Sequence, residues 1–108
     1  MSEKRPHILI TDDEKAIRNT LEEILQYENY EVSTAESGSN AIDFVAKNDI
    51  DLMFLDIKMQ GMDGLETLKK LREKGHEFPV IMISGHGTIE IAVEATKMGA
   101  YDFMEKPP

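Results

Sequence analysis

Short apolar runs alternate along the chain with stretches in which apolar residues recur every three or four positions. Runs of the first kind predict strands, and three of them are continuously apolar, at 8–10, 52–55 and 80–83. Continuous runs are typical of central strands in a parallel sheet, because helices cover both faces of such a sheet. A weaker alternating run suits an edge strand. The five strands are expected over residues 7–11, 30–34, 51–56, 79–84 and 101–105.

The stretches between these runs predict amphipathic helices. Ser37 and Asp63 precede the second and third of them and can cap their first turns. Gly75 and Gly99 stand where the third and fourth helices are expected to end. The fourth helix is expected to begin at a cap formed by Thr88 and to run to Met98. The apolar face of the first helix is expected to consist of Ile17, Leu21, Ile24 and Leu25.

Strand and helix therefore alternate four times before a fifth strand. Such alternation implies parallel strands that are joined by right-handed crossovers. The expected fold class is α/β, a flavodoxin-like, doubly wound sheet of five parallel strands in the order 2-1-3-4-5.

Polar side chains stand at the carboxyl ends of these strands. In doubly wound sheets, ligands bind beyond those ends, at the point where the strand order reverses. Asp12 and Asp13 follow the first strand, and Asp56 ends the third. Ser84 ends the fourth strand, and Lys106 follows the fifth. Three neighbouring carboxylates repel one another unless a cation lies among them, and Mg²⁺ prefers such oxygen ligands, so the sequence predicts a magnesium site here.

Each of these residues also has an ordinary structural explanation. The segment from Thr11 to Glu14 fits a capping box at the start of a helix. Asp56 fits a simple strand-ending acid, Ser84 a loop hydroxyl and Lys106 a solvated charge. The joint placement of all five at one edge favours a site, and a charge at the end of a buried strand needs compensation.

The acidic pair, the segment 55–64, Ser84 and Lys106-Pro107 resemble the receiver domain of two-component response regulators, in order and in spacing. The resemblance covers nearly the whole chain and implies the CheY-like form of the fold. The stretch 84–103 also resembles the NtrC/NtrX-like, sigma-54-activating subgroup. The resemblance implies a function in phosphorelay signal transduction, in which Asp56 accepts a phosphoryl group from a sensor histidine kinase. It implies no enzyme beyond self-catalysed phosphoryl acceptance and hydrolysis.

The resemblance also assigns roles to single residues. Asp13, Asp56 and the backbone carbonyl of Lys58 would bind Mg²⁺, and Asp12 would act mainly through a bound water. Lys106 and the hydroxyl of Ser84 would contact the phosphoryl oxygens. The ring of Phe103 would turn inward to switch the surface formed by the fourth helix and the fifth strand, although Phe103 also fits an ordinary core aromatic.

The chain departs from the family at a few positions. Gln60 replaces the usual proline after the phosphoacceptor, which is expected to loosen the turn without removing a ligand. Lys58 and His86 each lie two residues after a site residue, at positions that influence phosphate loss in the family, and Lys58 is predicted to alter the phosphate lifetime. Gly85-His86-Gly87 is expected to act as a hinge.

Three other functions fit the sequence less well. A phosphatase of the haloacid dehalogenase type needs a second acid two residues after the nucleophile, where Lys58 stands. A flavodoxin-like cofactor binder needs a hydroxyl- and glycine-rich loop after the first strand, where acids stand instead. A binding protein without phosphorylation would leave the acidic cluster idle.

Composition narrows the class of protein further. Twelve Lys and Arg stand against 21 Asp and Glu, for a net charge of −9, which argues against direct binding to nucleic acid or to an anionic membrane. The chain has no Cys, no run long enough for a membrane span and no signal-peptide core, so a cytoplasmic protein is expected.

The length of 108 residues leaves no room for the fifth helix that the family places after Lys106-Pro107. Residues 1–108 are therefore expected to form one receiver domain that is truncated before its last helix. The resemblance implies an output domain in the full-length protein, namely a sigma-54-activating ATPase with a DNA-binding domain. The uncovered apolar face is expected to favour a homodimer or other self-association.

Overall fold

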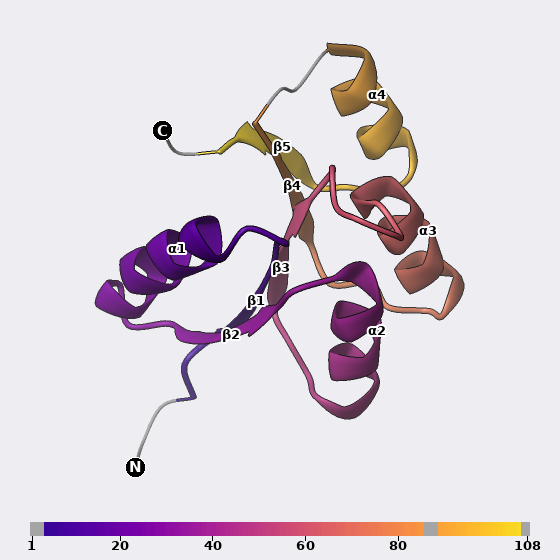
Figure 1. Cartoon of the computed structure of the whole chain (residues 1–108). Coiled ribbons are helices and arrows are strands. Elements are labelled where there is room, and N and C mark those ends of the chain that lie inside the picture. The colour runs from indigo at the N-terminus through magenta and orange to yellow at the C-terminus, as the bar shows by residue number, and fades with distance from the viewer. Residues whose placement is uncertain (1–3, 86–88, 107–108) are drawn as a thin grey trace.

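The computed structural model describes residues 4–85 and 89–106, which form one parallel sheet flanked by helices (Figure 1). The strand order is β2-β1-β3-β4-β5, and every neighbouring pair is parallel. The strands are β1 His7–Thr11, β2 Glu31–Ala35, β3 Leu52–Asp56, β4 Val80–Ser84 and β5 Asp102–Glu105. The helices are α1 Lys15–Tyr27, α2 Gly38–Lys47, α3 Gly64–Glu73 and α4 Ile89–Lys97. The predicted fold class and strand order are confirmed.

The element boundaries follow from local chemistry. Ser37 caps α2 by accepting a hydrogen bond from the Asn40 N–H at 3.1 Å, as its position predicted. Asp63 caps α3 in the same way, with the Glu66 N–H at 2.8 Å. Strand ends agree with the predictions to within one residue. The predicted cap at Thr88, like His86 and Gly87 of the predicted hinge and Pro107, lies outside the described residues.

The capping-box explanation for residues 11–14 is wrong. Thr11 is the last residue of β1, and its register partner on β2 is Ala35. The N-cap of α1 is Glu14, and its side chain makes no capping hydrogen bond. A capping box therefore does not account for the acidic residues at this turn.

Three helices cover one face of the sheet, namely α2, α3 and α4 (Figure 1). Because side chains alternate along a strand, every second residue of the central strands faces these helices. Those residues are fully buried, and small or branched side chains of the helices pack against them in one core. The strand members of this core are Leu9, Met53, Leu55, Val80 and Met82, and its helix members include Ala41, Val45, Leu68, Leu71 and Ala95.

On the other face, the described residues form one helix, α1, which packs over β1 and β2 (Figure 1). Ile8, Ile10 and Ile83 are buried here, but Met104 on β5 is 48% exposed. Ile24, predicted to lie on the inner face of the first helix, is 52% exposed, and α1 has no fully buried residue. The two faces of the sheet therefore differ in how completely they are covered.

Among the described residues, none of the helices combines the length and the apolar composition needed to cross a membrane.

Candidate functional site

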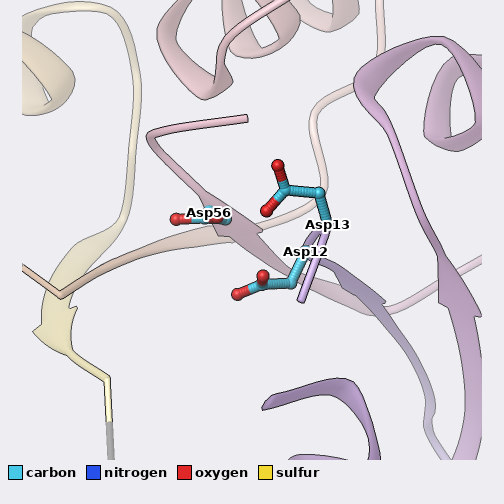
Figure 2. Close-up of side chains that lie close together, drawn as sticks. All are labelled: Asp12, Asp13 and Asp56. Carbon is cyan, nitrogen blue, oxygen red and sulfur yellow. The ribbon is translucent and has the colours of Figure 1, made fainter. Parts of the chain in front are cut away.

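Three carboxylates meet at the edge of the sheet where the strand order reverses (Figure 2). Asp12 and Asp13 follow β1, and Asp56 is the last residue of the neighbouring strand β3. One oxygen from each carboxylate lies within 4.8 Å of the others. Asp12 and Asp56 are 0% and 1% exposed, whereas Asp13 faces solvent. The site thus combines two buried acids with a third acid that is exposed to solvent.

Lys106 brings a positive charge to the two buried acids. Its Nζ lies 3.0 Å from Asp12 Oδ2 and 3.2 Å from Asp56 Oδ2. The lysine follows β5, and its backbone N–H donates to the Ser84 carbonyl at 2.9 Å, which extends the ladder between β4 and β5 by one residue. Its side chain is 9% exposed. The ammonium is therefore held inside the cluster and is not a solvated surface charge.

Glu14 is a third anionic partner of this lysine. Its Oε1 lies 2.7 Å from Lys106 Nζ, the shortest of the three contacts. The Glu14 backbone N–H also donates to Asp12 Oδ1 at 2.8 Å. Both carboxylate oxygens of Asp12 are therefore engaged, one by Glu14 and the other by Lys106.

The crowding of charges shifts the pKa values of the site. Burial raises the pKa of Asp56 to about 6, and the charge of Asp12 adds to this, while Lys106 and the Lys58 N–H partly offset the rise. Burial alone would lower the pKa of Lys106, but its hydrogen bonds with Glu14 and Asp12 and the nearby carboxylate charges outweigh burial and raise it. The hydrogen bond and the charge of Lys106 lower the pKa of Glu14.

The donor set fits a hard divalent cation. The cluster contains the four carboxylates of Asp12, Asp13, Glu14 and Asp56 against the one ammonium of Lys106, so it keeps an excess of negative charge once the acids are ionised. Burial and the charge of Asp12 raise the pKa of Asp56, and a cation among the oxygens would offset both effects. Oxygen ligands of this kind suit Mg²⁺. The described residues therefore contain a candidate site for Mg²⁺.

Backbone contacts hold the acidic turn in place. Arg18, in the second turn of α1, donates from Nη1 to the Asp12 carbonyl at 2.8 Å. The Gln60 N–H donates to Asp13 Oδ2 at 3.2 Å. Gln60 was expected only to loosen its turn, but it supplies a hydrogen bond that a proline, which has no N–H, cannot make.

Gly64 lets α3 begin directly against the phosphoacceptor candidate. Its N–H donates to the Ile57 carbonyl at 2.8 Å. A Cβ at this position would collide with the carbonyl oxygen of Asp56 and would lie 2.8 Å from Ile57 Cα. The absence of a side chain is therefore required for the close approach of α3 to the end of β3.

The remaining predicted site residues lie around this cluster. Ser84 ends β4 at the same edge and is 3% exposed. The Lys58 side chain is exposed, and its backbone N–H donates to the Asp56 carboxylate. Phe103 lies half-buried on β5 and packs against the core on the α2–α4 side, which fits the core-aromatic interpretation. Its switching role stays a prediction.

Sequence reasoning assigned no site role to Glu14 and did not single out Arg18. Glu14 was considered only as part of a capping box, and its partner Lys106 lies 92 residues away in the sequence. The signal that pointed to it was the acidic run 12–14 itself. That run located the turn but did not show which of its acids would meet the lysine.

The fold and the site together define a doubly wound α/β domain with an acidic edge that could hold a cation and a buried lysine beside it. The chain belongs to the response regulator receiver domain family, whose sequence profile matches residues 8–108. Membership confirms the resemblance that the motifs indicated.

Similar proteins come from several bacteria. The chain is 49% identical over 102 residues to the nitrogen assimilation regulatory protein NtrX of Azorhizobium caulinodans, an alignment that covers 93% of this chain and 22% of that protein. The crystal structure of the receiver domain of NtrX from Brucella abortus has a TM-score of 0.87 at 46% identity, over 94% of this chain and 86% of that one. The response regulator TrrA of Thermotoga maritima, crystallised with Mg²⁺ and BeF, has a TM-score of 0.85 at 33% identity, over 94% of this chain and 87% of that one.

The chain spans about a fifth of the length of the NtrX and NtrX-like relatives that it matches. The described domain therefore corresponds to one part of those proteins.

Proposed function

We propose that the chain acts in a phosphorelay and that Asp56 accepts a phosphoryl group from a phosphohistidine of a sensor histidine kinase. The observation that carries the proposal is the placement of Asp56, which ends β3 as a buried carboxylate between Lys106 and two further acids. With a pKa of about 6, this carboxylate is mostly ionised near neutral pH and is able to act as a nucleophile.

The transfer step is balanced as follows. A carboxylate oxygen of Asp56 forms a bond to phosphorus, and the phosphorus–nitrogen bond of the phosphohistidine breaks. The bonding electron pair stays with the leaving imidazole, which takes up a proton from solvent. The product is an aspartyl phosphate, an acyl phosphate that hydrolysis can later remove.

The acids of the site support a Mg²⁺-dependent reaction. We propose that Asp13, Asp56 and the Lys58 carbonyl bind the ion directly and that Asp12 acts through a water. The engagement of both Asp12 oxygens by Glu14 and Lys106 supports this indirect role. Bound Mg²⁺ would neutralise charge on the phosphoryl oxygens. The TrrA structure, which contains Mg²⁺ and BeF, supports the choice of ion.

Lys106 and Ser84 would contact the phosphoryl oxygens. The ammonium of Lys106 lies 3.2 Å from Asp56 Oδ2, so it is next to the carboxylate to which the phosphoryl group would be attached. Ser84 is the last residue of β4, which pairs with β3. In this pairing Asp56 lies opposite Ile83, the residue before Ser84.

We propose that Phe103, on β5, then changes its packing and alters the surface of α4 and β5. The exposure of Ile89 and Val93 on α4 supports a surface that meets a partner.

The similarity to NtrX supports a regulatory output. We propose that the domain controls a sigma-54-activating ATPase with a DNA-binding domain, as in the subgroup that it resembles, and that it does not itself bind nucleic acid. Ile24 on α1 and Met104 on β5 are exposed apolar side chains on the α1 side of the sheet, and they support the further proposal that this face takes part in self-association.

Intact mass spectrometry tests the proposal. The protein is incubated with Mg²⁺ and acetyl phosphate, and a single phosphoryl adduct is expected. Asp56→Asn should abolish the adduct, and chelation of Mg²⁺ should prevent it. Asp43→Asn, at an exposed position on α2, is the matched control and should react like the wild type. A folded protein that binds Mg²⁺ but forms no adduct would overturn the proposal.

A further inference from the structure

The ammonium of Lys106 makes its shortest contact with a residue outside the predicted site. Its Nζ lies 2.7 Å from Glu14 Oε1, against 3.0 Å to Asp12 and 3.2 Å to Asp56. An ammonium has three donor hydrogens. In this structure Glu14 and Asp56 accept hydrogen bonds from it, and Asp12 forms an ion pair with it.

Glu14 is well placed to keep this contact. Its backbone is fixed at the N-cap of α1, where its N–H donates to Asp12 Oδ1 and its carbonyl accepts from the Arg18 N–H at 3.1 Å. Its side chain is 61% exposed, so the carboxylate lies at the solvent side of a lysine that is itself 9% exposed. The contact thus joins the buried cluster to the surface.

We propose that Glu14 is a positioning residue that competes with the phosphoryl group for the ammonium of Lys106 and thereby slows phosphoryl acceptance. The inference rests on the proposed function of Asp56. Phosphoryl oxygens need a positive charge beside them in the transition state, and a fixed charge counts most where water is excluded. A carboxylate in contact with the ammonium offsets that charge. Displacing Glu14 is therefore part of the cost of phosphorylation.

Three variants separate the contact from the general field of the charge. Glu14→Gln removes the negative charge and weakens the contact. Glu14→Asp keeps the charge but shortens the side chain by one methylene, so it loses most of the contact. Glu23→Gln makes the same charge change at an exposed position on the same helix, and it serves as the matched control.

The kinetic measurement is phosphorylation by acetyl phosphate at saturating Mg²⁺, followed by intact mass. In this reaction Asp56 forms a bond to phosphorus, and acetate leaves with the electrons of the bond that breaks. Glu14→Gln is expected to raise the rate constant about three- to tenfold, with Glu14→Asp intermediate and Glu23→Gln close to wild type. The Mg²⁺ dissociation constant of Glu14→Gln should stay within about twofold of the wild-type value, because Glu14 is not among the three clustered metal-ligand candidates.

A second readout does not depend on phosphorylation. In protein with isotope-labelled lysine, the Lys106 ammonium resonance is identified by its loss in Lys106→Arg. It should shift in Glu14→Gln and not in Glu23→Gln. An unchanged resonance would overturn the inference, as would a shifted resonance with no rise in rate. If the resonance shifts but no protein forms an adduct, wild type included, then the phosphoacceptor role of Asp56 fails and the competition fails with it.

Discussion

The two faces of the sheet contrast in packing and in chemistry. On the face that α2, α3 and α4 cover, Leu9, Met53 and Leu55 have no exposed surface. On the face that α1 covers, Ile24 and Met104 remain about half exposed. Alternation along β3 places Asp56 in phase with Phe54, on the α1 side. The charged site therefore lies on the same side of the sheet as the less completely covered face.

The difference teaches where this fold can hold a cluster of charges. Ionised groups at the edge of a sealed hydrocarbon core would lack the partners and the solvent that they need. On the α1 side, the carboxylates of Asp12 and Asp56 contact Lys106. Glu14 also contacts this lysine, and its side chain is exposed to water. The packed face supplies stability, while the exposed carboxylates of Asp13 and Glu14 connect the edge of the other face to solvent.

Two methionines on adjacent strands provide the largest test of this contrast. Met82 lies on β4 with no exposed surface, whereas Met104 lies on β5 and is 48% exposed. Met82→Ala is expected to lower the free energy of unfolding by about 3 kcal/mol, because it removes buried surface and leaves a cavity. Met104→Ala should cost less than about 1 kcal/mol. Urea unfolding measures both, and equal losses would show that the two faces are equally packed.

Gly64 tests a point where a helix of the packed face approaches the site. A methyl group at Gly64 would collide with the Asp56 carbonyl oxygen, so Gly64→Ala is expected to cost about 2 kcal/mol and to weaken Mg²⁺ binding. Gly85→Ala is the control, because a Cβ at that position meets no atom within 4 Å. Urea unfolding and a Mg²⁺ titration are the measurements. Similar behaviour of the two variants would mean that α3 yields without disturbing β3.

Much of the fold could be predicted because its signals are local. The continuous run 52–55 predicted a central strand, and β3 is the middle strand of the sheet. The acids that end or follow β1 and β3 could be placed together because the carboxyl ends of parallel strands share one edge. Strand order and strand ends together were enough to bring Asp12, Asp13 and Asp56 into one cluster.

What escaped prediction depends on contacts between distant segments. Periodicity placed Ile24 on the inner face of α1, but it does not tell how far the neighbouring elements cover that face. Likewise, the sequence shows that Glu14 is acidic but not that it meets Lys106. Gln60 was identified as a departure from the family, yet its hydrogen bond to Asp13 joins residues 47 positions apart.

The smallest expected effect concerns how protonation of Asp56 changes the free energy of unfolding. Because burial and Asp12 raise the pKa of Asp56 to about 6, above its value in the unfolded chain, the folded state binds this proton more tightly. Stability without Mg²⁺ should therefore fall as the pH rises from about 4 to about 6, and the loss should persist above that range. Asp56→Asn removes this loss, so it should raise the free energy of unfolding by about 1 kcal/mol near pH 8 and by much less near pH 4.5. Urea unfolding in the presence of a chelator measures the difference, with Asp43→Asn as the control. A variant that is less stable than wild type near pH 8 would show that the ion pair with Lys106 outweighs the burial and repulsion of the Asp56 charge.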